Sequence, residues 1–221
     1  MTTLLDAVEV ETGRNPQASV IWLHGLGADG HDFEPVVPEL VRPGERALRF
    51  VFPHAPVRPV TLNNGYAMRA WYDILGLDRQ AKQDEAGIRG SAAAIRALIA
   101  RENERGVASA RIVLAGFSQG GAMALLTGLR YPERLAGIMG LSCYPVLAST
   151  FDAERDPANQ ETPILLAHGT FDPMVDLSLG QAGKEMLEKR GYKVEWHSYP
   201  MPHAVSPEEI GAIAAWLRRV L

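Results

Sequence analysis

Short, continuous apolar runs that alternate with longer amphipathic stretches restrict the fold of this sequence more than any other feature. The apolar runs span residues 19–24, 48–52, 111–115, 135–141, 163–167 and 193–199. Runs that are apolar at every position are typical of strands covered on both faces, and such strands are usually parallel. Strand alternating with helix predicts an α/β fold with right-handed crossovers. In such sheets, ligands bind at the carboxyl ends of the strands.

The helical stretches carry their own signals. Over residues 84–105, apolar side chains recur at helical spacing. The last helix is predicted to begin at Ser206, with Pro207 in the first position and Glu209 completing a capping box. We find no internal repeat and no low-complexity linker, so a single domain is predicted over residues 1–221.

Charge and cysteine content exclude several classes of protein. The formal net charge of −4 leaves no basic field, so nucleic acid is not expected as a partner. Cys143 is the only cysteine, which excludes an intrachain disulfide and suits a reducing compartment. No signal-peptide pattern is visible, and no apolar run approaches the roughly 18 residues that cross a bilayer. We therefore expect a cytoplasmic protein without a membrane span.

The most informative motif is Gly116-x-Ser118-x-Gly120, which directly follows an apolar run and directly precedes a helical one. A sharp strand-to-helix turn strains the backbone of its central serine, so the residues two positions away must be small. The turn also places the serine at a helix N-terminus, where the helix dipole favours a developing anion. A turn that merely packed a helix closely would not require a hydroxyl at its centre. We therefore interpret Ser118 as a nucleophile.

A serine nucleophile needs a base, and in strand–turn–helix hydrolases the chain order is Ser, then Asp or Glu, then His. This order excludes the three histidines that precede Ser118. Of the three that follow it, His168 comes just after a predicted strand and His197 lies inside one, so both are interpreted as structural. His203 lies between the last strand and the last helix, and it is predicted to be the base.

The predicted acid follows the apolar run at residues 163–167. Asp172 lies in the turn itself, where it can point across the strand ends, whereas Asp176 lies where the next helix should begin and is expected to cap it or to face water. The acid should hold the imidazole tautomer and stabilise the imidazolium. Asp172 is therefore predicted to complete the triad.

Two further groups complete the predicted site. The backbone N–H groups of Gln119, which follows the nucleophile, and of Leu26, in the glycine-rich turn after residues 19–24, are predicted to form the oxyanion hole. The stretch at residues 63–73 interrupts the strand–helix rhythm with large side chains. Met68, Trp71 and Tyr72 are predicted to line a substrate pocket, and the alternative for Trp71 and Tyr72 is a place in the core. Cys143 is expected to be buried and unreactive.

Taken together, these segments resemble the phospholipase/carboxylesterase family, which includes acyl-protein thioesterases. The resemblance rests on His24-Gly-Leu-Gly-Ala-Asp-Gly-His-Asp-Phe33, Met68-Arg-Ala-Trp-Tyr-Asp-Ile74, Gly116-Phe-Ser-Gln-Gly-Gly-Ala-Met-Ala124, His168-Gly-Thr-Phe-Asp172 and Pro202-His203. It implies an α/β-hydrolase fold with a mostly parallel central sheet, helices on both faces and no separate lid domain. It also implies the triad Ser118, Asp172 and His203, with oxyanion donors at Leu26 and Gln119. Members are often homodimers, so a homodimer is an expectation here.

The expected function is hydrolysis of small-molecule or lipid acyl esters, with acylated proteins as a further substrate class. The chemistry runs through an acyl-enzyme and needs no metal and no organic cofactor. One alternative is a catalytically silent binding module, since a fold alone does not determine function. Another is a lactonase or perhydrolase that uses the same triad.

Overall fold

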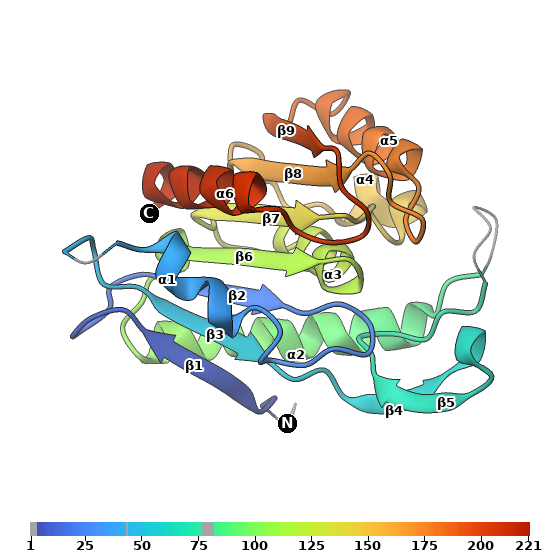
Figure 1. The fold of residues 1–221 in the computed structure, drawn as a ribbon, viewed down its shortest axis with the longest axis horizontal. Coiled ribbons are helices and arrows are strands. Elements are labelled where there is room, and N and C mark those ends of the chain that lie inside the picture. Colours follow the sequence, from blue (N-terminus) through green and yellow to red (C-terminus); the bar gives the residue numbers. More distant parts are fainter. Residues whose placement is uncertain (1–3, 43, 77–81) are drawn as a thin grey trace.

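A seven-stranded sheet forms the centre of the protein (Figure 1). The computed structural model describes residues 4–42, 44–76 and 82–221. The strand order is β1-β3-β2-β6-β7-β8-β9, and every neighbouring pair is parallel except β1 with β3. The strands are β1 (Ala7–Glu11), β2 (Ser19–Leu23), β3 (Arg49–Pro53), β6 (Ile112–Phe117), β7 (Gly137–Leu141), β8 (Ile164–Gly169) and β9 (Val194–Tyr199). All six predicted strands belong to this sheet.

Helices cover both faces of the sheet, so the predicted mostly parallel α/β architecture is confirmed. The helices are α1 (Val37–Leu40), α2 (Glu85–Glu104), α3 (Gln119–Gly128), α4 (Phe151–Glu154), α5 (Leu177–Glu188) and α6 (Pro207–Val220). Short 3-10 turns are η1 (Glu34–Val36), η2 (Thr61–Asn63), η3 (Ser109–Arg111), η4 (Ala148–Thr150) and η5 (Pro157–Asn159). Side chains of α2 and α3 pack into one core and those of α1 and α6 into the other. Along β2, Ile21 and Leu23 face the first core, whereas Val20 and Trp22 face the second.

Three strands were not predicted from the sequence. β1 pairs antiparallel at the sheet edge and is only partly buried, so its apolar signal is weak. β4 (Val57–Val60) and β5 (Tyr66–Arg69) form a separate antiparallel hairpin. This hairpin lies beyond the carboxyl end of β3 (Figure 1), and its β5 strand leads into the stretch that interrupts the strand–helix rhythm.

Both predicted helix caps are present. The Asp176 side chain accepts the N–H of Ser178 at the start of α5. At the start of α6, Ser206 Oγ accepts the N–H of Glu209 at 3.2 Å. The second half of the capping box differs from the prediction. The Glu209 carboxylate is fully buried, and neither of its oxygens makes a hydrogen bond of ordinary geometry within the described part of the chain.

Glu209 makes the stability of the protein dependent on pH. Burial raises the pKa of Glu209 from 4.5 to about 7, against the opposing effect of the Ser206 backbone. Because the pKa of Glu209 is higher in the folded protein, its contribution to the free energy of unfolding is fully present below about pH 4.5. This contribution is lost as the pH rises through about 7. Glu209→Gln, a neutral replacement, should therefore stabilise the protein above pH 7 by up to about 3 kcal/mol, from about 1.4 kcal/mol per pKa unit.

Thermal unfolding at pH 5 and pH 8.5 measures this effect. The gain in Tm of Glu209→Gln over the wild type should be larger at pH 8.5. Glu208→Gln is the matched control, since Glu208 is the exposed neighbour in the same helix turn. An equal gain at both pH values would show that ionisation of Glu209 does not limit stability.

Candidate active site

The nucleophile turn has the strained geometry that the motif predicts. Ser118 lies between β6 and α3 with φ 55° and ψ −121°. A backbone of this kind costs about 1–3 kcal/mol for a residue other than glycine. A Cβ on Gly116 would lie 2.3 Å from the carbonyl of Gly120, and a Cβ on Gly120 would lie 2.2 Å from the Leu23 carbonyl oxygen. Both positions therefore require glycine because the backbones pass too closely for a side chain.

The structure brings the three predicted triad residues into one hydrogen-bonded line. His203 Nε2 lies 2.9 Å from Ser118 Oγ, and His203 Nδ1 lies 2.6 Å from Asp172 Oδ2. His203 comes from the loop between β9 and α6, and Asp172 from the loop after β8. The His203 ring also packs on Phe117, with 4.7 Å between ring centroids. The geometry allows proton transfer from the hydroxyl to the imidazole.

Asp172 is held in place by its own loop. Its side chain is fully buried, and Oδ1 accepts the N–H groups of Met174 and Val175, each at 2.8 Å. His168, which is also buried, lies 3.6 Å from Asp172 Oδ2, and its Nε2 hydrogen-bonds the Val175 carbonyl at 2.9 Å. His168 thus supports the loop that carries the acid. The sequence analysis assigns His168 only a structural role. Its position four residues before Asp172 is the signal that could have indicated its contact with the acid.

The remaining histidines have other partners. Burial lowers the pKa of His24, whose Nε2 accepts the Ala55 N–H and whose Nδ1 donates to the Gly25 carbonyl. His54 accepts the N–H of Gly30 at 3.0 Å. His31 pairs with Glu34 and His197 with Glu195. These contacts agree with the choice of His203 from chain order.

Leu26 and Gln119 line the same pocket as Ser118. The Ser118 N–H donates to the Leu141 carbonyl, and the Gly27 N–H donates to the Arg69 carbonyl. The Leu26 N–H has no acceptor among the described residues. Gln119 is the first residue of α3, where helix N–H groups have no acceptor within the helix. Leu26 and Gln119, the two predicted oxyanion residues, therefore lie where N–H groups remain available for a ligand.

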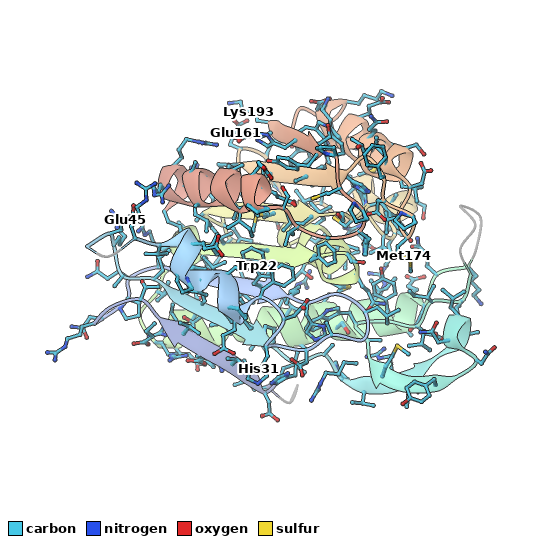
Figure 2. All side chains as sticks on the ribbon, in the orientation of Figure 1. Trp22, His31, Glu45, Glu161, Met174 and Lys193 are labelled. Carbon is cyan, nitrogen blue, oxygen red and sulfur yellow. The ribbon has the colours of Figure 1, made fainter. Side chains whose placement is uncertain are left out.

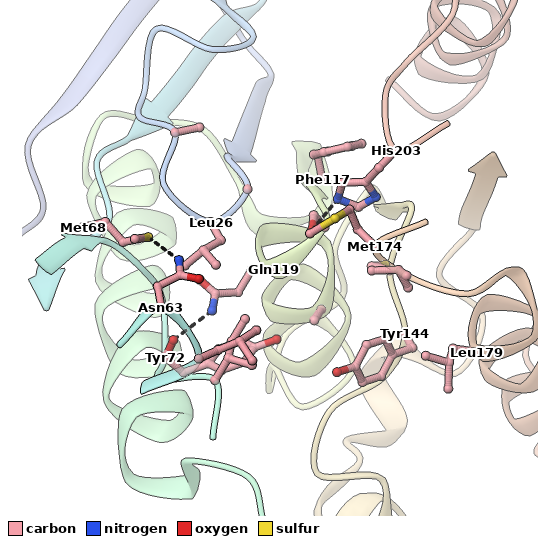
Figure 3. Close-up of a pocket in the computed structure, with 18 of the residues that line it drawn as sticks. Leu26, Asn63, Met68, Tyr72, Phe117, Gln119, Tyr144, Met174, Leu179 and His203 are labelled. Atoms are coloured by element: carbon pink, nitrogen blue, oxygen red, sulfur yellow. Dashed lines mark hydrogen bonds between the residues drawn. The ribbon is translucent and has the colours of Figure 1, made fainter. Parts of the chain in front are cut away.

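A pocket of about 430 Å³ opens at Ser118 and His203. Of the three predicted wall residues, Met68 and Tyr72 line it. Trp71 does not: its side chain is fully buried in the core, and its indole N–H donates to the His24 carbonyl. The pocket interpretation is thus wrong for Trp71, because the chain turns its side chain under the loop at residues 24–27. Figure 3 shows Leu26 and Gln119 on one wall, opposite His203 and Met174.

Several lining residues could not be assigned from the sequence. They come from the β4–β5 hairpin, the loop after β7, the loop after β8 and the start of α5: Leu62, Asn63, Cys143, Tyr144, Val175 and Leu179. Burial raises the pKa of the Cys143 thiol to about 12, so it stays protonated and unreactive at neutral pH. Met174 lies on the rim beyond the strand ends (Figure 2), with most of its side chain exposed.

The described residues hold no group of three or more His, Cys, Asp or Glu side chains arranged to bind a metal ion. Within the same residues, none of the helices has the length and apolar character needed to cross a membrane.

Comparisons with known proteins agree with this geometry. A family model described as Phospholipase/Carboxylesterase matches residues 5–221. Acyl-protein thioesterase 1 of Neurospora crassa is 44% identical over 211 residues, which cover 90% of this chain and 85% of that protein. Acyl-protein thioesterase 1 of Gibberella zeae is 41% identical over 213 residues, covering 92% and 91%. The crystal structure of Arabidopsis thaliana SOBER1 superposes with a TM-score of 0.86 at 33% identity, covering 92% of this chain and 98% of that one.

Proposed function

We propose that this chain, which belongs to the phospholipase/carboxylesterase family and is a serine hydrolase of acyl esters with the α/β-hydrolase fold, acts through Ser118, His203 and Asp172. The single observation that carries the proposal is the hydrogen-bonded line from Ser118 Oγ through His203 to Asp172. Ser118, at one end of this line, borders an apolar pocket that Leu26 and Gln119 also line.

In the first half-reaction, Ser118 Oγ attacks the acyl carbonyl carbon while His203 Nε2 takes the hydroxyl proton. The carbonyl oxygen becomes an oxyanion that the N–H groups of Leu26 and Gln119 stabilise. When the tetrahedral intermediate collapses, its bond to the leaving group breaks and His203 gives the proton to the alcohol or thiol. Asp172 stabilises the imidazolium and does not take its proton.

In the second half-reaction, water attacks the acyl-enzyme carbonyl and gives its proton to His203. Collapse of this intermediate releases the carboxylic acid and returns the proton to Ser118 Oγ. The net reaction consumes one water and yields an acid and an alcohol or thiol. Every proton transfer uses His203 Nε2, which is 2.9 Å from the serine oxygen.

The pocket supports an acyl chain as the recognised group. Ile74, Ala122 and Leu179 contribute apolar walls, and Tyr72 contributes a buried ring. The curated relatives are named acyl-protein thioesterases, which supports S-acylated proteins beside small-molecule and lipid esters as substrates. Met174 is exposed at the pocket, and Phe171, on the same loop, is exposed as well, which supports association with a partner there. A homodimer in the cytoplasm is part of the proposal.

A panel of p-nitrophenyl esters from acetate to palmitate, together with an S-acyl thioester, tests the proposed function. We expect turnover with a chain-length optimum, and stoichiometric inactivation by a fluorophosphonate that modifies Ser118 in peptide mass spectra. Absence of turnover on the whole panel, with no labelling of Ser118, would favour a silent binding module. Labelling of another residue would contradict the proposed nucleophile.

A further inference from the structure

The segment at residues 69–73 links the two predicted halves of the oxyanion hole. It follows the hairpin and contains the fully buried residues Ala70 and Trp71. Apart from Arg69, the last residue of β5, it belongs to no helix and no strand, so its backbone groups are free to bond other parts of the chain. They do so on two sides, toward the loop that carries Leu26 and toward Gln119.

On the first side, the 69–73 segment makes two hydrogen bonds to the loop at residues 24–27. The Gly27 N–H donates to the Arg69 carbonyl at 2.9 Å. The Trp71 indole N–H donates to the His24 carbonyl, also at 2.9 Å. These bonds lie on either side of Leu26 in the sequence. Together they hold the backbone on both sides of Leu26.

On the second side, the segment binds the side chain of Gln119. Gln119 Oε1 accepts the Trp71 N–H at 2.7 Å. Gln119 Nε2 donates to the Tyr72 carbonyl at 2.8 Å, the bond drawn in Figure 3. The Gln119 side chain is buried, so water does not compete well for these bonds. The residue whose N–H is the second predicted donor is therefore tied through its side chain to the same short segment.

The segment is itself held by the rest of the protein. The Ser91 hydroxyl of α2 donates to the Trp71 carbonyl, and the Asp84 carboxylate, at the N-cap of α2, accepts the Asp73 N–H at 2.9 Å. The Ala70 N–H donates to the Pro56 carbonyl at 3.1 Å. The 69–73 segment is thus anchored to the rest of the protein. The loop that carries Leu26 and the side chain of Gln119 are both hydrogen-bonded to it.

We propose that the 69–73 segment sets the distance between the two oxyanion donors, with the Trp71 indole and the Gln119 side chain as positioning residues. The inference rests on the proposed function, because it concerns the oxyanion of that reaction. Donors must be placed to within about 0.5 Å for effective stabilisation. A displacement of about 1 Å from a remote change can lower a rate by about 100-fold.

Trp71→Phe tests the first link, because it keeps an aromatic ring and removes the bond to the His24 carbonyl. We expect kcat for p-nitrophenyl butyrate to fall about 10-fold or more, with KM nearly unchanged. The affinity for a trifluoromethyl ketone, which forms an anionic tetrahedral adduct with the serine, should fall in parallel. Trp22→Phe is the matched control, since Trp22 is equally buried and its indole N–H has no acceptor among the described residues. It should lose stability without changing kcat.

Gln119→Met tests the second link, because it keeps the length of the side chain and removes both hydrogen bonds while the backbone N–H remains. A fall in kcat of about 10- to 100-fold is expected, with the same parallel loss of trifluoromethyl ketone affinity. If both Trp71→Phe and Gln119→Met fold, react with fluorophosphonate and keep the wild-type kcat, the positioning role is wrong although the proposed function stands. An inactive wild type would instead contradict the proposed function.

Discussion

Ser118→Ala is expected to lower kcat for ester hydrolysis by about 10⁶-fold, the loss seen when the triad serine is removed from a serine protease. The replacement removes the atom that forms the acyl-enzyme and leaves His203 and the backbone donors in place. His203→Ala should cost a similar factor, because the serine hydroxyl is a poor nucleophile without a base 2.9 Å away.

The double variant gives the stronger test. Residues that act as a unit are non-additive, so Ser118→Ala with His203→Ala should be no slower than either single variant. Ser198→Ala, at an exposed position of β9, is the control and should keep full activity. Initial rates with p-nitrophenyl butyrate, measured on variants whose thermal unfolding is cooperative, provide the comparison. Turnover comparable to the wild type in Ser118→Ala would assign the reaction to another nucleophile.

Asp172→Asn is expected to lower kcat by about 10⁴-fold, as in the serine-protease triad. The asparagine Oδ1 can still accept the N–H groups of Met174 and Val175, so the loop should keep its shape. Its Nδ2 would instead donate to His203 Nδ1. The proton of the imidazole would then lie on Nε2, which faces Ser118 Oγ and could no longer accept the hydroxyl proton.

Asp176→Asn is the matched control for this variant. Asp176 lies on the same loop and caps α5, and asparagine caps a helix about as well as aspartate. Steady-state kinetics should show a large loss in kcat for Asp172→Asn alone, with both proteins folded to similar Tm values. Equal losses in the two variants would mean that the loop, and not the charge at residue 172, supports the reaction.

Much of the fold could be predicted because its signals are local. Five of the six predicted strands, β2, β3, β6, β7 and β8, are buried and mostly apolar, and a parallel strand covered on both faces has that pattern wherever it lies in the sheet. The sixth, β9, is a partly buried edge strand whose apolar residues are interrupted by polar ones. β1 and the β4–β5 hairpin escaped prediction because an edge strand and an exposed hairpin bury too little to show a clear pattern.

The site residues also separate into those that a local sequence pattern predicts and those that it does not. The Gly116-x-Ser118-x-Gly120 turn is local: its glycines are required by contacts within a few residues and with β2, and its serine is strained by the turn itself. The order of Ser118, Asp172 and His203 is a property of the chain, and it placed each residue after the correct strand. The amino-acid sequence is therefore sufficient to name these three residues and to predict the hydrogen bonds between them.

Only the tertiary structure determined which of the other side chains line the pocket and which lie in the core. Trp71 and Tyr72 are adjacent in sequence, yet Tyr72 lines the pocket and Trp71 bonds the His24 carbonyl in the core. Both are large and apolar, so composition cannot separate them. Gln119, 48 and 47 positions away, bonds the Trp71 N–H and the Tyr72 carbonyl, the backbone groups on the two outer sides of this pair. The sequence alone determined the chemical groups and their order along the chain. The packing of distant segments determined which of those groups meet, because a contact between remote residues leaves no pattern near either one.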